Sequence, residues 1–224
     1  MYKDLFGNGP IRHKTILNGR DAEAIDILIN LHCPTSNPKI LDCTYNSGKM
    51  WKNSRYHPTT RMDIDPLLDV DVVGDFTNMP FGDSEYDIIV FDPPHLPVAA
   101  ASENSSKIWE KSYGITDNGI GREGDNVSSM FLPFLKEAER VLKKNGIVLA
   151  KIADIIHNHR YQWQQVDFVN AVRQTNMTPC DMMIKCDPNA GNLTSSKWNK
   201  IKHLRKSHCY WIVVRNSGRC ECII

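Results

Sequence analysis

This sequence of 224 residues lacks several features that mark other classes of protein. No apolar run approaches the length of a membrane span, and the first ten residues, MYKDLFGNGP, contain no apolar signal core. The seven cysteines are an odd number and do not have the spacing of a disulfide framework. We therefore expect no membrane association, and we expect reduced thiols, as in a cytoplasm.

An excess of one charge is also lacking, because 27 Lys and Arg face 26 Asp and Glu, for a formal net charge of +1. Taken as a total, this balance argues against a nucleic-acid partner. The charges are nevertheless segregated along the chain. The nine acids of residues 63–92, a stretch without Lys or Arg, are Asp63, Asp65, Asp69, Asp71, Asp75, Asp83, Glu85, Asp87 and Asp92. The five bases of residues 197–208, a stretch without acids, are Lys197, Lys200, Lys202, Arg205 and Lys206.

Runs of like charge are most often solvated surface. The more specific interpretation is an acidic pocket for a cationic small molecule beside a basic surface for a polyanion. Charge alone does not choose between these two interpretations, so the choice depends on the motifs.

The composition is that of a globular protein with a sizeable core, since hydrophobic residues make up 41% of the chain. Its length fits one α/β domain over residues 1–224. Residues 21–32 have helical spacing of apolar side chains behind Asp21, a candidate N-cap, and Tyr86–Phe91 (YDIIVF) has the pattern of a buried strand. We predict further helices at 127–144 and 160–175, and strands at 39–41, 59–63, 70–73, 146–151, 178–185 and 209–215.

Strands separated by helices predict a mostly parallel sheet that is covered on both faces. Pro133 is expected to kink the helix at 127–144 or to delay its start. Only about seven residues separate Asp63 from the third strand, too few for a crossover helix, so the sheet is expected to be trimmed at that edge.

Two long segments, 95–126 and 187–207, have little periodicity, and we expect them to be loop insertions that form the substrate side. Ligands of an open α/β sheet bind at the carboxyl ends of its strands. Four acids, which would need a cation or hydrogen-bond donors to face them, fall at or just beyond predicted strand ends: Asp42, Asp63, Asp75 and Asp92.

The segment 40–51, ILDCTYNSGKMW, is a predicted strand that runs into an Asp and then into a turn of small residues. Within this segment there is neither the G-x-G-x-x-G of a dinucleotide site nor the Lys-Ser/Thr of a phosphate loop. A ligand without phosphates, such as S-adenosylmethionine, needs no such cradle. Its cationic and hydroxyl groups suit carboxylates at strand ends, although an ordinary strand-turn-helix explains this segment equally well.

Residues 92–95 are Asp-Pro-Pro-His, directly after the strand YDIIVF. Here the sequence resembles the amino-methylating class I methyltransferases, whose fourth motif has this form. Upstream segments resemble their other motifs in order: ILDCTYNSG, MDID and GDFTNMPF. The resemblance covers roughly residues 38–215 and is strongest to small phage- and bacteria-associated DNA methyltransferases. It implies a Rossmann-like fold with a mostly parallel seven-stranded sheet, and a cytoplasmic location in a bacterial or phage-infected cell.

The resemblance assigns Asp92, Pro93, Pro94 and His95 to catalysis. An exocyclic amine of a nucleobase is a poor nucleophile because its lone pair is delocalised into the ring. Asp92 and the carbonyl of Pro93 can accept the two amino hydrogens and direct the lone pair at the methyl group. His95 occupies the position of a ring that stacks on the flipped base, where Tyr, Phe or Trp is commoner.

The resemblance also implies S-adenosylmethionine as the cofactor. Asp42 would face its methionine end, and Thr44, Asn46 and Gly48 would shape the turn beside it. Asp63 would bind the ribose hydroxyls, with Asp65 as the alternative. Asp75 would accept from the adenine amino group, and Phe76 would pack on the adenine ring or serve as ordinary core.

Candidate substrate-binding residues lie in the two insertions. Trp109 and Tyr113 are expected to stack on an extruded nucleotide, and Lys107 to hold a phosphate, although Trp109 serves equally well as an anchor for its loop. The bases that would follow a nucleic-acid backbone are Lys200, Lys202, Arg205 and Lys206. No cysteine or histidine group has the spacing of a structural zinc site, and direct methyl transfer needs no metal, so we expect none.

The sequence therefore predicts an S-adenosylmethionine-dependent methyltransferase that acts on an exocyclic amine in DNA, with adenine N6 favoured by the Asp of the motif. RNA or cytosine N4 as the target remains an alternative. A catalytically silent methyltransferase-like nucleic-acid-binding subunit is another. Because no target-recognition domain of ordinary size is left over, a protein partner or a second copy of the chain is a further expected source of target recognition.

Overall fold

The computed structural model describes residues 14–95, 127–157, 160–186, 204 and 206–216. Within these residues the main sheet has eight strands in the order β1-β9-β10-β6-β5-β2-β3-β4. Its strands are β1 (Ile16–Asn18), β2 (Ile40–Asp42), β3 (Thr60–Asp63), β4 (Val72–Val73), β5 (Tyr86–Phe91), β6 (Leu142–Ile152), β9 (Met177–Cys186) and β10 (His208–Asn216). The neighbours from β6 to β4 are parallel, and β10 is antiparallel to both β6 and β9.

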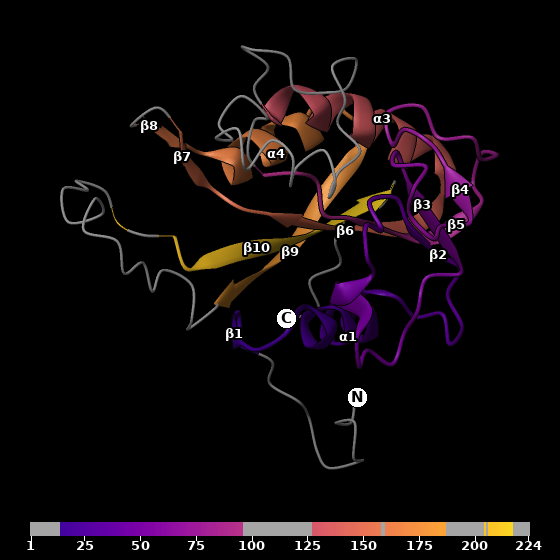
Figure 1. Cartoon of the computed structure of the whole chain (residues 1–224), viewed down its shortest axis with the longest axis horizontal. Helices are drawn as coiled ribbons and strands as arrows, with labels where there is room; N and C mark the ends of the chain where they lie inside the picture. The colour runs from indigo at the N-terminus through magenta and orange to yellow at the C-terminus, as the bar shows by residue number, and fades with distance from the viewer. Residues whose placement is uncertain (1–13, 96–126, 158–159, 187–203, 205, 217–224) are drawn as a thin grey trace.

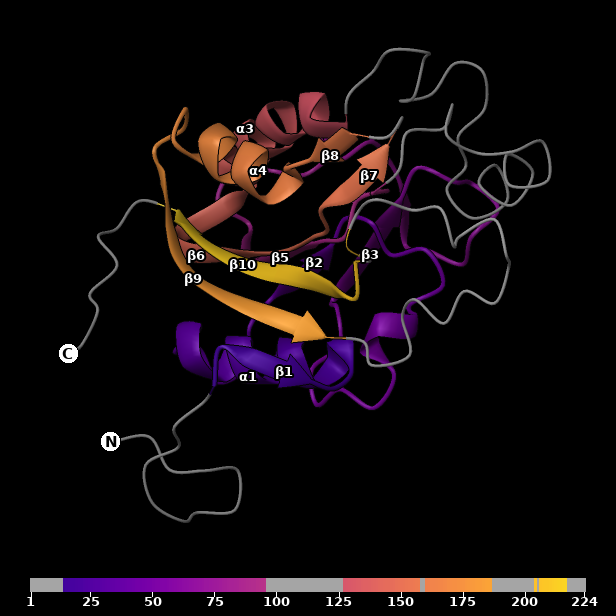
Figure 2. The same ribbon diagram turned by 90° about the vertical axis from the view of Figure 1, so that its left-hand side faces the viewer.

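Helices lie on both faces of this sheet (Figure 1), as the turned view also shows (Figure 2). One face carries α1 (Asp21–His32), and the other carries α3 (Phe131–Val141) and α4 (Gln164–Val172). Short 3-10 helices span Lys49–Trp51 and Val127–Met130. The predicted mostly parallel sheet with helices on both faces is confirmed. Seven strands are the predicted ones, and β1, paired in parallel with β9, adds an eighth.

The position of β5 in the middle of the sheet explains why its sequence does not alternate between apolar and polar residues. Side chains of a strand alternate between the two faces of the sheet. Ile88 and Val90 pack on the side of α1, whereas Ile89 and Phe91 pack on the side of α3 and α4, and all four are fully buried. A parallel strand that is covered on both faces has this uniformly apolar pattern.

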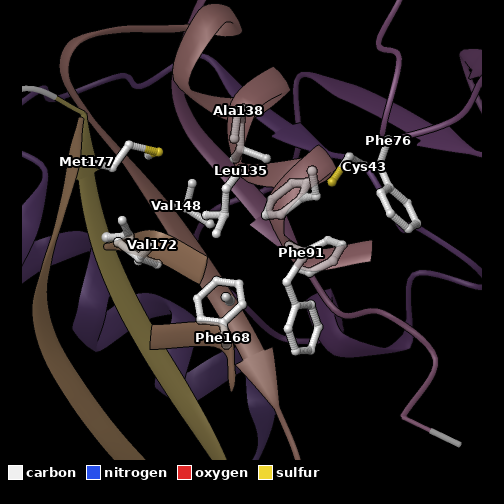
Figure 3. Packing of buried hydrophobic residues seen from close by; sticks show 14 of the residues in the cluster. Cys43, Phe76, Phe91, Leu135, Ala138, Val148, Phe168, Val172 and Met177 are labelled. Carbon is white, nitrogen blue, oxygen red and sulfur yellow. The ribbon is translucent and has the colours of Figure 1, made fainter. Parts of the chain in front are cut away.

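The core beneath α3 and α4 is rich in phenylalanine (Figure 3). Phe91 of β5 stacks on Phe134 of α3 with ring centroids 3.7 Å apart and an angle of 9° between the planes. Phe168 of α4 packs edge-on against Phe131 at 5.3 Å. This cluster fixes β5 against both helices, and β5 leads directly into Asp92.

Several predicted boundaries need correction. The helix expected at 127–144 begins as a 3-10 turn, and α3 ends at Val141, because Leu142 already pairs with β5. Pro133 is the third residue of α3, where its missing N–H has no helical partner to lose, so the delayed start is confirmed. The N-cap of α1 is Arg20, not Asp21.

The helix expected at 160–175 is also shorter than predicted. Arg160–Gln162 forms β8, which pairs antiparallel with β7 (Ile155–His157) in a separate hairpin, and α4 follows from Gln164. At the other edge, β4 has only two residues and residues 64–71 contain no helix, in agreement with the expected trimming. Among the described residues, no helix is long and apolar enough to span a membrane.

Candidate functional site

Three carboxylates lie at adjacent strand ends and form what we call the acidic rim: Asp42, Asp63 and Asp92. Asp42 ends β2, Asp63 ends β3 and Asp92 follows β5 directly. Because β2 lies between β5 and β3 and all three strands are parallel, these ends meet at one edge. The charges are close enough that Asp92 and Asp63 both raise the pKa of Asp42. The predicted convergence of these three acids is therefore seen in the structure.

Asp42 is fully buried at the centre of the acidic rim. Its Oδ2 accepts a hydrogen bond from the indole Nε1 of Trp51 at 2.6 Å, and its Oδ1 accepts from the backbone N–H of Thr44 at 3.0 Å. Burial raises the pKa of Asp42 to about 7 in spite of these two donors. The site therefore holds a carboxyl that is only partly ionised at neutral pH, and a nearby cation would favour its charged form.

The turn after β2 connects the members of the acidic rim. The Thr44 hydroxyl oxygen accepts from the backbone N–H of Asp92 at 2.8 Å, and the backbone N–H of Asn46 donates to Asp63 Oδ2 at 2.7 Å. Gly48 has a φ of 63°, and a Cβ there would lie 2.4 Å from the Tyr45 hydroxyl. Only glycine fits this position without rearrangement.

Asp63 and Asp65, the two alternatives for a ribose partner, are both buried. Asp63 Oδ1 accepts from the backbone N–H of Asp65 at 3.1 Å, and Asp65 Oδ1 accepts from the backbone N–H of Leu67 at 2.9 Å. Burial raises the pKa of Asp63, opposed by its backbone donors. Both residues thus belong to one hydrogen-bonded turn, and the choice between them stays a prediction.

Asp75 and Phe76 follow the short strand β4. Asp75 Oδ1 accepts from the backbone N–H and from the hydroxyl of Thr77, at 2.7 and 2.8 Å, so it closes its own turn. Phe76 is 8% exposed and packs edge-on against Phe91 and Phe134 at 5.2 and 6.0 Å. The ring is therefore part of the core, and Figure 3 draws it among the buried hydrophobic residues. Its contact with an adenine ring stays a prediction.

The Asp-Pro-Pro-His motif centres on the Asp92 carboxylate. Its Oδ2 accepts from the ammonium of Lys151 at 3.0 Å, and its Oδ1 lies 3.2 Å from His95 Nε2. Burial alone would raise the pKa of Asp92, but Lys151 and His95 outweigh it and hold the pKa below its usual value. Asp92 is thus a carboxylate at neutral pH. Of the two prolines that follow, Pro93 is buried and Pro94 is partly buried.

Lys151 was not among the residues predicted for the site. Its ammonium also lies 3.3 Å from Asp21 Oδ2, and Asp21 is in turn bound by Lys185 at 3.1 Å and by the indole Nε1 of Trp211 at 3.3 Å. Burial lowers the pKa of Lys151, but Asp92 and Asp21 more than reverse this. The sequence did contain a signal for this residue. Lys151 is a lone basic residue at the end of the predicted apolar strand 146–151, and the acidic rim is formed at strand ends.

The nine acids of residues 63–92 divide into two groups. Those away from the rim pair with bases from outside the stretch: Asp69 and Asp71 with Arg61, Asp83 with Arg140, Glu85 with Lys39 and Asp87 with Lys143. The remaining four, which lie at or just beyond strand ends and are buried or half-buried, are Asp63, Asp65, Asp75 and Asp92. The first group is therefore mostly exposed and ion-paired, whereas an acidic pocket for a cationic small molecule at the second group stays a prediction.

The predicted substrate-binding residues are mostly outside the described residues: Lys107, Trp109, Tyr113, Lys200, Lys202 and Arg205. Lys206 is described, and its ammonium lies 3.6 Å from the centroid of the Tyr161 ring and donates to the Tyr161 hydroxyl. Within the described part of the chain, no group of three or more His, Cys, Asp or Glu side chains is arranged to hold a metal ion.

A scan against known protein families found no matching family model, and a search of curated proteins found no match. Solved structures do share the fold. A candidate sarcosine dimethylglycine methyltransferase from Galdieria sulphuraria is similar with a TM-score of 0.53 at 14% identity, over 88% of this chain and 85% of that one.

A complex between the Haloferax volcanii Trm112 methyltransferase activator and a candidate methyltransferase gives a TM-score of 0.51 at 13% identity, over 93% of this chain and 100% of that one. A candidate DNA modification methylase from Thermus thermophilus gives 0.41 at 13% identity over 65% of this chain, which spans about half, 51%, of that protein's length. The two structures with TM-scores above 0.5 show that the chain has the Rossmann-like class I methyltransferase fold.

Proposed function

We propose that this protein is an S-adenosylmethionine-dependent methyltransferase that modifies an exocyclic amine of a nucleobase in DNA, with adenine N6 as the target. The observation that carries the proposal is the Asp92 carboxylate. It follows β5 directly, is ionised, and belongs to the same rim as Asp42 and Asp63. An acceptor beside a cation site is what methyl transfer to a weakly nucleophilic amine requires.

The rim fits the cofactor by the chemistry of its groups. Asp42 and Asp63 are buried acids whose pKa values are raised by burial, so a cation brought beside them would be favourable. In this proposal Asp42, with the turn of Thr44, Asn46 and Gly48, takes the methionine end. Asp63 takes the ribose hydroxyls, and Asp75 and Phe76 border the adenine. When bound, S-adenosylmethionine supplies a methyl group activated by its sulfonium.

Asp92 and Pro93 prepare the target amine in this proposal. The Asp92 carboxylate accepts one amino hydrogen and the Pro93 carbonyl accepts the other, which localises the lone pair on nitrogen. The new N–C bond forms as the C–S bond breaks, and Asp92 is able to take the surplus proton from the methylated amine. A carboxylate has about four acceptor sites, so Lys151 and His95 leave capacity for the substrate.

An Asp as the first residue of the motif supports adenine over cytosine, by its resemblance to the amino-methylating enzymes. We further propose that a protein partner or a second copy of this chain contributes target recognition. The Haloferax volcanii neighbour, which is a complex with an activator, supports the idea of a partner. Light scattering of the purified chain, alone and in the presence of DNA, tests for the second copy.

The test of the proposal is transfer of tritiated methyl groups to DNA and to RNA, followed by mass spectrometry of the nucleosides. We expect N6-methyladenine in DNA, and we expect the Asp92→Ala variant to lose transfer while it binds the cofactor with nearly unchanged affinity. Label in RNA or on cytosine N4 would overturn the substrate assignment. Full turnover by the Asp92→Ala variant would overturn the role of that carboxylate.

A further inference from the structure

The hairpin β7–β8 carries two aromatic rings that the proposed reaction does not use. Tyr161 of β8 and Trp163, directly after it, have ring centroids 4.3 Å apart with a tilt of 34°. We call this pair the aromatic step. Trp163 is 57% exposed, and it is the only aromatic among the exposed large apolar side chains of the described residues. Covering exposed indole surface is favourable, so Trp163 offers an aromatic face on which a ligand ring can stack.

The Tyr161 ring of the aromatic step is anchored by a buried carboxylate. Buried Asp154, between β6 and β7, accepts from the Tyr161 hydroxyl at 2.9 Å, from the Tyr210 hydroxyl at 3.4 Å and from the backbone N–H of Gln165 at 3.1 Å. Burial and the hydrogen bond to Asp154 raise the pKa of Tyr161, which keeps its hydroxyl protonated as a donor. The Tyr161 ring is therefore fixed in place before any ligand arrives, which lowers the entropic cost of binding.

The aromatic step is also attached to the Asp-Pro-Pro-His motif. Gln164, the residue after Trp163, is buried, and its Nε2 donates to the carbonyl of His95 at 2.8 Å. Gln164 Oε1 is buried with no hydrogen-bond partner among the described residues. The step thus borders the last residue of the motif whose first residue is Asp92.

Positive charge accompanies the rings. The Lys206 ammonium lies against the face of Tyr161, and Arg160, on the same strand as Tyr161, is exposed. Aromatic faces with adjacent cations are the means by which proteins bind single-stranded nucleic acid without reading its sequence. An acidic ligand without a ring would use only the cations, and a purely apolar ligand would use only the aromatic faces.

We propose that the aromatic step binds a nucleobase next to the target base in single-stranded or locally unpaired DNA, by stacking on Trp163. This inference rests on the proposed function and names a second contact for the same substrate. Stacking here would hold the strand so that the target base lies beside Asp92. It would also make the enzyme tolerant of the sequence at that neighbouring position, because every base has an aromatic face.

The test measures binding of a fluorescein-labelled single-stranded deoxyoligonucleotide of about 12 nucleotides by anisotropy. We expect Trp163→Ala to weaken binding by about 5- to 150-fold, the range found for loss of one stacked base, and Trp163→Phe to retain most of the affinity. Val73→Ala, which truncates another exposed apolar side chain on the distant edge strand β4, should bind like the unmodified protein. Unchanged cofactor affinity in calorimetry shows that each variant is folded.

Oligonucleotides with an abasic spacer on either side of the single target adenine make the test sharper. One spacer position should weaken binding by the unmodified protein but have no further effect in Trp163→Ala, because the two changes remove the same contact. Equal binding by Trp163→Ala and the unmodified protein, or additive effects of spacer and substitution, would overturn the inference. So would tighter binding of the matching ribo-oligonucleotide, because the inference commits to DNA.

Turnover measured on the same oligonucleotide separates this inference from the proposed function. Methyl transfer with an unchanged KM in Trp163→Ala overturns only the aromatic step. Binding that depends on Trp163, without any methyl transfer by the unmodified protein, overturns only the proposed reaction. No binding by the unmodified protein overturns both.

Discussion

The raised pKa of Asp42 makes the affinity for S-adenosylmethionine dependent on pH in a calculable way. With a pKa of about 7 in the free protein, Asp42 is about 90% ionised at pH 8 and about 10% ionised at pH 6. A cationic ligand beside Asp42 binds the form in which Asp42 is ionised. At lower pH, binding therefore requires the Asp42 carboxyl to lose its proton, which costs free energy. The contribution of Asp42 to the association constant should therefore fall about tenfold between pH 8 and pH 6.

The cofactor's own amino group titrates near pH 8 and would obscure this effect in a simple titration. The remedy is to compare the unmodified protein with Asp42→Asn, which has nearly the same shape and stays neutral. Calorimetry at pH 8, 7 and 6 gives the ratio of the two affinities, in which titration of the cofactor cancels. This ratio should fall about tenfold from pH 8 to pH 6 as Asp42 becomes protonated.

A ratio that stays constant over this range would refute the reasoning, because either Asp42 would be ionised throughout or the cation would lie elsewhere. Trp51→Phe gives an independent check. It removes the indole N–H that lowers the pKa of Asp42, so the fall in affinity should begin at a higher pH than in the unmodified protein. A fall displaced to lower pH would contradict the hydrogen bond as its cause.

Three further predictions concern single side chains. Asp63→Asn should weaken cofactor binding by about 10- to 100-fold, the value of a charged hydrogen bond, and a larger loss in Asp65→Asn would transfer the ribose role to Asp65. Lys151→Met should move the acidic limb of the kcat profile to higher pH, because burial then raises the pKa of Asp92 without its main opposing charge, whereas Lys151→Arg should keep it. An unmoved limb in Lys151→Met would show that Lys151 does not act through Asp92. Phe91→Ala, which removes a fully buried ring stacked on Phe134, should lower the free energy of unfolding in urea by about 3–5 kcal/mol. A loss below about 1 kcal/mol would show that the ring is not a main support of β5.

Elements with a strong local pattern were predicted closely. Helix Asp21–His32 and strand Tyr86–Phe91 have the expected bounds, because the spacing of apolar side chains records which faces are buried. The hairpin formed by Ile155–His157 and Arg160–Gln162 was missed, because strands of three residues are too short to show a period of two in their side chains. The helix predicted at 160–175 included Arg160–Gln162, and no element was predicted for Ile155–His157.

The acidic rim was predictable because each of its members ends or directly follows a strand, and parallel strands end at one edge. The supports of Asp92 were not predictable, since they are contacts between residues far apart in the sequence. Asp21 carried the pattern of a helix cap, yet its carboxylate binds Lys151 and Lys185. Only the packing of α1 against the sheet brings these charges together, and no local pattern encodes that packing.

The ion pairs behind Asp92 also relate the finished site to the order in which the chain is made. Asp21 comes from the first helix, Asp92 from the middle strand, Lys151 from β6 and Lys185 from β9, with Trp211 of β10 completing the set. A polypeptide still in synthesis, with β9 and β10 not yet available, lacks the partners that fix Asp21 against Lys151. The support of the motif is therefore complete only when β9 and β10 have joined the sheet, so an unfinished chain has all of the motif, with Lys151 beside Asp92, but lacks the partners that fix Asp21.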